Sequence, residues 1–181
     1  MKSNMILIFS FVFMVFNFKS QEIKNTLPWR KVSFVDSYFG QTKTTYKRQL
    51  LQERIFMILL NITRVSTLHQ PLVSLGTFRL NKGAYLHSID MAQTNKFAHY
   101  NFDNRSDEFH FNGENIIFNH RGAFSMYWGW MNSEGHRKNM MNWGYFFTGL
   151  GFCKKKQITY FNNKKRKKEK VVSFYGTQVF R

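Results

Sequence analysis

A carboxylate and two imidazoles stand in local contexts that could form a polar site. Glu114 follows Gly113, His136 follows Gly135, and His99 lies a short distance upstream of Glu114. Carboxylate and imidazole groups can bind zinc or a similar divalent metal, and without a metal they can act as a general base. The two glycines indicate that the backbone turns tightly or passes close to another group. The sequence therefore predicts a polar cleft.

Apolar spacing predicts the helices that would position these groups. Leucine and isoleucine recur at helical spacing from Lys47 to about Val65, and a second helix is expected over Thr77–Thr94. A loop over Phe97–Asn112 and a third helix over Gly122–Asn132 follow. Ser133 then caps a short helix with an acidic first turn and a basic last turn.

Strands account for the rest of the predicted core. Residues 116–118 suggest a strand or a tight turn, and two further strands are expected over Phe146–Lys154 and Val171–Phe180. His87 lies on the apolar stripe of the second helix, so we expect it to be buried with a hydrogen-bond partner rather than to be a ligand. Cys153, the single cysteine, is expected to be a small buried residue without a disulfide.

Length and composition predict one globular domain with an export signal. The chain has 181 residues, of which 43% are hydrophobic. Residues 1–20 have the basic start and short apolar run of a signal peptide, with an uncleaved anchor as the alternative. Residues 21–46 are expected to form an N-terminal arm and residues 47–181 the domain. A secreted or periplasmic location follows, with no membrane-spanning helix after signal removal.

Basic charge is concentrated near the C-terminus. The net charge is +17, and residues 154–170 hold nine Lys or Arg against Glu169 alone, so this block is predicted to be the tip of a β-hairpin. It is either a solvated loop or a site for an anionic surface. No aromatic platform is interleaved with it, so sequence-specific nucleic-acid binding is not expected. The candidate residues for binding an anionic surface are Lys164, Lys165, Arg166, Lys167 and Lys168.

Seven motifs in fixed order resemble those of the CAP superfamily, the cysteine-rich secretory, antigen 5 and pathogenesis-related proteins. The closest likeness is to the bacterial branch of SCP-like extracellular proteins, which lacks disulfides. The resemblance covers about residues 50–181 and implies an α+β fold, a three-layer α-β-α sandwich with one central cleft. The motifs are Leu60–Arg64, Ala84–Ala92, Phe97–His99, Gly113–Ile116, Trp130–Met140, Gly149–Gly151 and Thr177–Phe180.

Many members of this family place two histidines and two acidic residues in the cleft, and some bind a divalent metal there. The resemblance implies that His99 matches the first histidine and Glu114 the first acid. Glu134 is the nearest match to the second acid, and His110 is a rival for the first histidine. His136 stands in for the second histidine, because the usual position of that residue holds an aromatic side chain. The residues expected to line the cleft are Asn115, Ser133, Tyr175 and Gln178.

Three functions remain open at this point. The preferred one is a secreted, non-enzymatic binding domain, whose His/Glu cleft holds a divalent metal or forms a purely polar pocket. An adjacent groove would take a lipid or a peptide, as the resemblance implies. The second is an extracellular, protease-like hydrolase that uses Glu114 and His136, although neither a His-Glu-x-x-His helix nor a Gly-x-Ser-x-Gly motif is present. The third is a surface adhesin acting through the basic hairpin. Glu114, Asn115 and His136 could also form a buried structural network.

Overall fold

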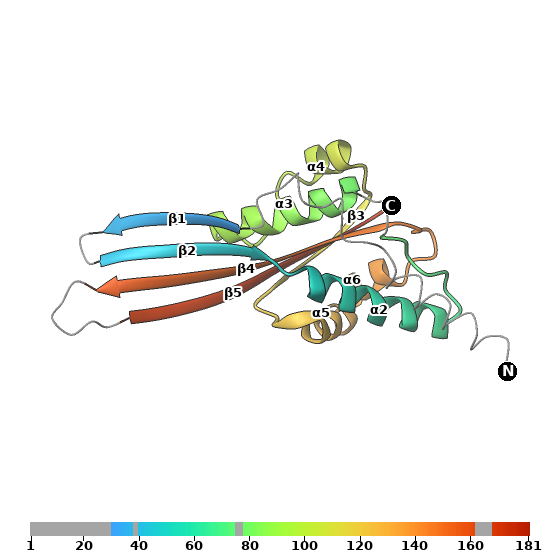
Figure 1. Cartoon of the computed structure of the whole chain (residues 1–181). Helices are drawn as coiled ribbons and strands as arrows, with labels where there is room; N and C mark the ends of the chain where they lie inside the picture. The colour runs from blue at the N-terminus through green and yellow to red at the C-terminus, as the bar shows by residue number, and fades with distance from the viewer. Residues whose placement is uncertain (1–29, 38–39, 75–77, 162–167) are drawn as a thin grey trace.

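One antiparallel sheet organises the molecule (Figure 1). The computed structural model describes residues 30–37, 40–74, 78–161 and 168–181. The strand order is β1-β2-β4-β5-β3, which places β3 at an edge of the sheet. The elements in chain order are β1 (Arg30–Ser37), β2 (Gly40–Arg48), α2 (Leu50–Ser66), α3 (Phe78–Thr94), α4 (Phe102–Phe109), β3 (Gly113–Phe118), α5 (Gly122–Met131), α6 (Glu134–Met140), β4 (Thr148–Phe161) and β5 (Lys168–Phe180).

Helices cover both faces of the inner part of the sheet. Successive side chains of a strand point to opposite faces, and here both sets include apolar residues that pack against helices. Phe152 of β4 points toward α2 and α5, where its ring centroid lies 5.6 Å from that of Phe56 and 6.1 Å from that of Trp130. The next residue, Cys153, belongs to the opposite cluster, together with Met91 of α3. This arrangement confirms the predicted α+β fold and its α-β-α layers.

Two glycines let α3 lie directly on the backbone of β4. A Cβ atom at Gly149 would collide with the backbone of Leu80, and one at Gly151 with the backbone of Tyr85. The hydroxyl of Ser88 donates to the Gly151 carbonyl oxygen over 2.6 Å, which fixes the helix at this contact. No side-chain layer separates helix and strand here, so both positions require glycine.

Arg64 anchors the connection between α6 and β4. Its buried guanidinium donates to the carbonyl oxygens of Gln70 at 2.8 Å, Met140 at 2.6 Å and Asn142 at 3.2 Å. Burial lowers the pKa of this group, and the carbonyl dipoles at the end of α6 supply the compensating polar contacts. The C-terminal end of α6 is thereby held against α2.

The structure differs from the sequence predictions in three segments. Residues 30–37 and 40–48 form β1 and β2, which pair with each other and extend the sheet, where an N-terminal arm was expected. The predicted loop over Phe97–Asn112 contains α4. The basic hairpin is present, but its strands pair as far as Tyr160 and Lys168, so the connection is shorter than residues 154–170.

Several local expectations are confirmed. Helices α2, α3 and α5 lie within a few residues of their predicted bounds. Cys153 is a free, buried thiol, and burial raises its pKa to about 12. The sequence predicted a tight turn or a close approach at both Gly113 and Gly135, and the structure differs between the two. A Cβ at Gly113 would press on the Tyr145 hydroxyl, as the close approach requires, whereas Gly135 lies in α6 with open space around it, so that part was wrong.

Replacing Gly151 by alanine should lower the free energy of unfolding by about 3 kcal/mol, because a backbone-to-backbone contact cannot relax by moving a side chain. Gly135→Ala is the matched control. It adds the same methyl group to an open helical site, so it should leave stability unchanged or raise it by up to about 1 kcal/mol. Urea denaturation measures both variants, and equal losses in the two would contradict the direct docking of α3 on β4.

Candidate functional site

Strand β3 sends neighbouring side chains to opposite sides of the sheet. Ile116 joins the apolar cluster beneath α3, and Ile117 joins the cluster beneath α2 and α5. By the same alternation, Glu114 points to the α3 side and Asn115 to the α6 side. β3 is an edge strand of the described sheet, and every one of its residues except Phe118 is buried.

Glu114 is locked by groups from α4 and from the loop after α3. Its side chain is fully buried, with 0% exposed. The Arg105 guanidinium donates to both carboxylate oxygens, with Nη2 lying 2.9 Å from Oε1 and Nη1 in contact with Oε2. His99 Nδ1 lies 2.9 Å from Oε1. Burial alone would raise the pKa of Glu114, but the hydrogen bonds from His99 and Arg105 outweigh it and hold the pKa below its ordinary value.

His87 is the fourth member of this cluster. Its Nε2 lies 3.8 Å from Glu114 Oε1, and its ring meets the Tyr100 ring edge-on with centroids 5.1 Å apart. His87 is buried as expected and its ring lies against the Ala98 backbone, but neither ring nitrogen makes a hydrogen bond of full geometry within the described residues. Burial lowers the pKa of His87 to about 4 despite the opposing pull of Glu114, so the ring is neutral at pH 7.

The surroundings of Glu114 do not fit a divalent cation. A guanidinium already occupies both carboxylate oxygens, and its positive charge would repel a metal ion at the same place. Within the described residues, no group of three or more His, Cys, Asp or Glu side chains is arranged to hold a metal. The arrangement is that of a structural ion pair closed by two histidines.

Asn115 holds the other side of β3 to α6. Its side-chain amide donates to the His136 carbonyl oxygen over 3.1 Å and accepts from Asn139 Nδ2 over 2.9 Å. Asn115 is fully buried, so replacing it by an apolar residue would leave these α6 groups without a partner. Asn115 thus ties the short helix α6 to β3, together with a longer contact of 3.5 Å from Asn139 Nδ2 to the Glu114 carbonyl oxygen.

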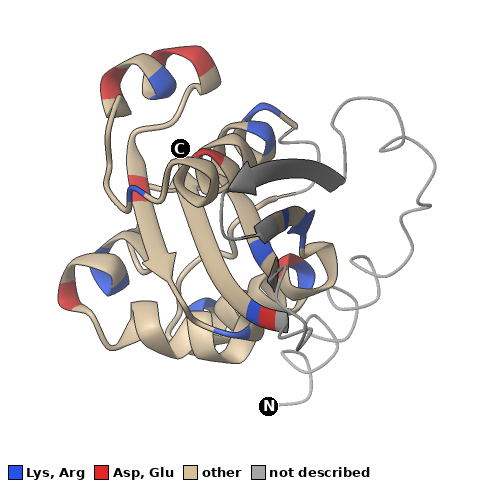
Figure 2. Cartoon of the chain, turned by 90° about the vertical axis from the view of Figure 1, so that its left-hand side faces the viewer, with Lys and Arg blue, Asp and Glu red and all other residues tan. Residues whose placement is uncertain are grey.

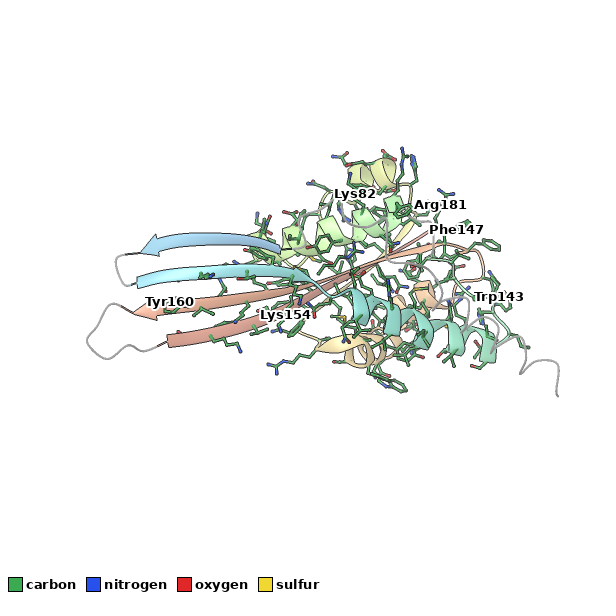
Figure 3. All side chains as sticks on the ribbon, viewed as in Figure 1. Lys82, Trp143, Phe147, Lys154, Tyr160 and Arg181 are labelled. Carbon is green, nitrogen blue, oxygen red and sulfur yellow. The ribbon has the colours of Figure 1, made fainter. Side chains whose placement is uncertain are left out.

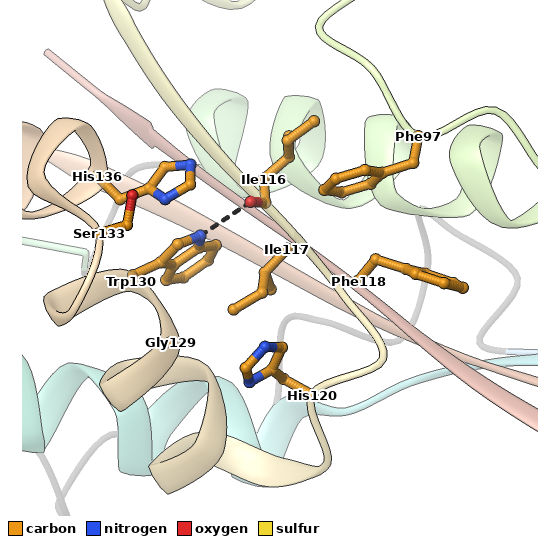
Figure 4. Close-up of a pocket in the computed structure, with 9 residues that line it drawn as sticks. All are labelled: Phe97, Ile116, Ile117, Phe118, His120, Gly129, Trp130, Ser133 and His136. Carbon is orange, nitrogen blue, oxygen red and sulfur yellow. Dashed lines mark hydrogen bonds between the residues drawn. The ribbon is translucent and has the colours of Figure 1, made fainter.

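A cleft of about 260 Å³ opens along the edge of β3, between α5, α6 and the loop after α3 (Figure 4). Trp130 closes its floor, where the indole Nε1 donates to the Ile116 carbonyl oxygen over 3.0 Å. Phe97 and Phe118 stand at its rim with ring centroids 5.9 Å apart, and they are 48% and 40% exposed. The lining residues are Phe97, Ile116, Ile117, Phe118, His120, Gly129, Trp130, Ser133 and His136.

His136 is a polar group of this cleft with unused hydrogen-bonding capacity. Its Nδ1 is buried and has no partner within the residues that the structure describes. Burial lowers the pKa of His136, and repulsion from the nearby His99 lowers it further, so the ring is neutral at pH 7. By contrast, Nδ1 of His120 lies 2.9 Å from the Ser125 carbonyl oxygen. A ligand could therefore satisfy His136 without displacing an existing bond.

The structure brings together only some of the residues that the sequence selected. Ser133 and His136 line the cleft, whereas Glu114 and Asn115 hold its walls from behind. Tyr175 is buried in the cluster under α3. Gln178 is buried and donates to the Thr148 hydroxyl.

The other candidates lie elsewhere. Glu134 is exposed in the first turn of α6, and His110 is exposed at the end of α4, where its Nε2 contacts Arg79. Lys164 to Lys167 fall outside the described residues, and Lys168 begins β5.

Sequence reasoning missed Arg105 and the aromatic rim. Arg105 was passed over because residues 97–112 were treated as loop. The spacing of Phe102 and Phe109, seven residues apart, was the signal for the helix that carries it. Phe118 ends β3, His120 follows the strand, and neither carried a motif of its own, so only the fold shows that they reach the cleft.

Comparison with known proteins places the fold in a family. The model of the cysteine-rich secretory protein family (CAP) matches residues 77–180, which include every element from α3 to β5. The chain belongs to the CAP family. This confirms the resemblance inferred from the motifs, although this chain has a single cysteine in a family described as cysteine-rich.

One curated relative of this CAP chain comes from a bacterium. An uncharacterized membrane protein of Bacillus subtilis, YlbC, is 37% identical over 81 residues, which are 40% of this chain and 23% of that protein. The chain thus spans under a quarter of this curated relative. Within the described residues, no helix has the length and apolar character needed to cross a bilayer.

Solved structures show the same fold at low identity. An extracellular SCP-domain protein of Bacillus anthracis aligns with a TM-score of 0.52 at 20% identity, over 83% of this chain and 60% of that one. A cysteine-rich secretory protein of Staphylococcus aureus aligns at 0.51 and 15% identity, over 72% and 38%. An outer surface protein of Borrelia burgdorferi aligns at 0.51 and 13% identity, over 83% and 98%. These neighbours are extracellular or surface proteins.

The buried histidine predicts a pH dependence of stability. An unfolded histidine takes up a proton near pH 6.5, whereas native His87 stays neutral down to about pH 4. The unfolded state therefore binds more protons in this window, and the stability present above pH 6.5 falls, by roughly 3 kcal/mol, as the pH drops toward 4. Urea denaturation across this range measures the slope.

His87→Gln should flatten this slope, because glutamine does not titrate. His110→Gln, at an exposed histidine, is the control. An identical slope in wild type and His87→Gln would show that His87 is not held neutral by burial.

Proposed function

We propose that this CAP domain is an exported binding protein that holds a short apolar group in the cleft beside β3, and that it is not a hydrolase. The carrying observation is the lining of the cleft, in which aromatic and isoleucine side chains surround one neutral histidine with an unpartnered nitrogen. Ligand sites in proteins have this composition, an apolar wall with few polar groups. The extracellular and surface neighbours support export.

Size limits the ligand. A cleft of about 260 Å³ lies at the lower end of the range for small-molecule sites, which begins at roughly 300 Å³. One acyl chain or one apolar peptide side chain fits such a space, and a whole drug-sized molecule does not. Phe97 and Phe118 at the rim would cover the part that enters. His136 Nδ1 would bond to a carboxyl, ester or amide group at the head of that chain.

Catalysis by the motif carboxylate has less support. Glu114 is fully buried, paired with Arg105 and absent from the lining of the cleft, so it cannot reach a substrate there as a general base. Ser133 and His136 do share the cleft, but the described structure shows no hydrogen bond between them, which a nucleophile and its base would require. A binding role therefore accounts for the residues of the cleft better than a hydrolytic role does.

Calorimetry with a series of straight-chain fatty acids, from hexanoate to dodecanoate, tests the proposal on the full chain. The binding free energy should become more favourable by about 0.8 kcal/mol for each methylene that enters the cleft, and it should stop changing once the cleft is full. N-acetylated leucine and phenylalanine amides form the peptide arm of the same experiment. Tighter binding of these amides than of octanoate would identify a peptide side chain as the natural occupant.

A filling substitution provides the structural control. Ser133 has no side-chain capping bond in the described structure, so Ser133→Leu fills the cleft without removing a contact and should abolish binding in either arm. Asn132→Leu adds a similar side chain at the neighbouring exposed position outside the cleft and should bind as wild type does. If neither arm gives binding, or if the two variants bind equally, the cleft is not the ligand site.

A further inference from the structure

The four strands β1, β2, β4 and β5 extend past the helices as the outer part of the same sheet (Figure 1). On the α3 side, the buried amine of Lys155 donates to Asn95 at the end of that helix. On the opposite side, Phe174 packs against the cluster of α2 and α5 and marks the last covered position. Beyond Phe174, none of the helices in the described part of the chain lies on this second face.

Pairing register places lysines together on that uncovered face. Lys47, Lys154 and Phe174 lie side by side on β2, β4 and β5. Residues two positions apart on a strand share a face, so Lys156 and Lys170 stand on the same side farther out. Figure 3 shows Lys154 where the projecting strands leave the helices. We call Lys47, Lys154, Lys156 and Lys170 the basic sheet face.

Acidic side chains do not neutralise this face. None of its four lysines makes a salt bridge within the described residues, and Glu169 lies on the opposite side because it pairs with Thr159. Of the other acids in the described residues, Glu114 is paired on β3, Asp36 stands at the outer end of β1 opposite Gln41, and the rest lie on helices such as α4 (Figure 2). Lys47 and Lys154 are direct cross-strand partners, and like charges in that position destabilise a sheet. An anionic partner would turn this repulsion into attraction.

The spacing makes the four charges act together. Strands lie about 4.8 Å apart, and same-face residues on one strand are about 6.7 Å apart, so the face is roughly 15 Å long. That length is comparable with the Debye length of about 10 Å at 0.1 M salt. The electrostatic potentials of the four lysines would therefore add up at the surface of a flat partner that carries many negative charges.

The side chains between the lysines favour a bilayer over a nucleic acid. Val172 and Ile158 alternate with the lysines on this face, which suits an interface where ammonium groups reach phosphates above apolar atoms. Single-stranded nucleic acids bind by stacking bases on open aromatic rings. On this face the Lys154 ammonium lies 5.7 Å from the ring centroid of Phe174, and Tyr160 is 45% exposed near the outer end. The described side chains of β4 and β5 therefore present two separate rings and not a row on which successive bases could stack.

We propose that the basic sheet face docks on a lipid bilayer that carries anionic phospholipid headgroups. The opposite face of the same strands presents neutral polar residues such as Thr42, Gln157 and Thr159, so docking has one orientation. In that orientation the sheet lies along the membrane. This site is separate from the cleft and does not depend on the function proposed for it.

Flotation with vesicles tests the proposal on the full chain. Vesicles of phosphatidylglycerol and phosphatidylcholine should bind the protein at 50 mM salt and release it at 500 mM, and pure phosphatidylcholine should not bind. Changing Lys47, Lys154, Lys156 and Lys170 together to glutamine should weaken the binding by roughly two to three orders of magnitude. Thermal unfolding checks that this variant is folded, and loss of the Lys47–Lys154 repulsion should leave it at least as stable as wild type.

Two charge-matched variants decide where the surface lies. Changing the exposed Arg54, Lys82, Lys96 and Lys138 to glutamine removes the same net charge from the helices and the loop after α3, and should weaken binding less than tenfold. The proposal is overturned if this control weakens binding as much as the face variant does. It is also overturned if neutralising Lys164 to Lys167 abolishes binding while the face variant still binds. Binding of single-stranded DNA as tight as that of the vesicles would overturn the choice of a bilayer.

Discussion

The hydrogen bonds of two adjacent residues on an edge strand hold both walls of the cleft. Glu114 binds His99 and Arg105 on one side of β3, and this fixes the loop that carries the rim residue Phe97. Asn115 binds α6 on the other side. Strand geometry makes this division unavoidable, because neighbouring side chains point to opposite faces. No described strand pairs with the outer side of β3, and the cleft lies along that edge between the two walls.

This division separates stability from binding. The carboxylate that looks most like a catalytic or metal-binding group is buried as an ion pair, and removing either partner would leave a charge without compensation. The groups that a ligand can reach are mainly apolar, with His136 as the available polar contact. The motif around Glu114 therefore supports the walls of the cleft, and most of the residues that line the cleft lie outside this motif.

The sequence predicted the fold well where the signal was periodic or came in ordered motifs. The stripe through Leu80 and Met91 gave α3, and the glycines at 149 and 151 mark where it docks. It failed where tertiary contacts decide the structure. Arg105 lies on α4, whose polar composition led to the prediction of a loop, and it binds Glu114. β2 joins the sheet by pairing with β4, and β1 pairs with β2, which no local pattern shows. The cleft lining depends on the same tertiary packing.

Amide hydrogen exchange in two variants tests the paired support most directly, with amides of β4 as the reference for global unfolding. Glu114→Gln should speed exchange in residues 97–105 and leave α6 protected. Asn115→Ala should speed exchange in α6 and leave residues 97–105 protected. If both variants loosened the same segment, or if neither changed exchange outside β3, the two walls would not be held separately by Glu114 and Asn115.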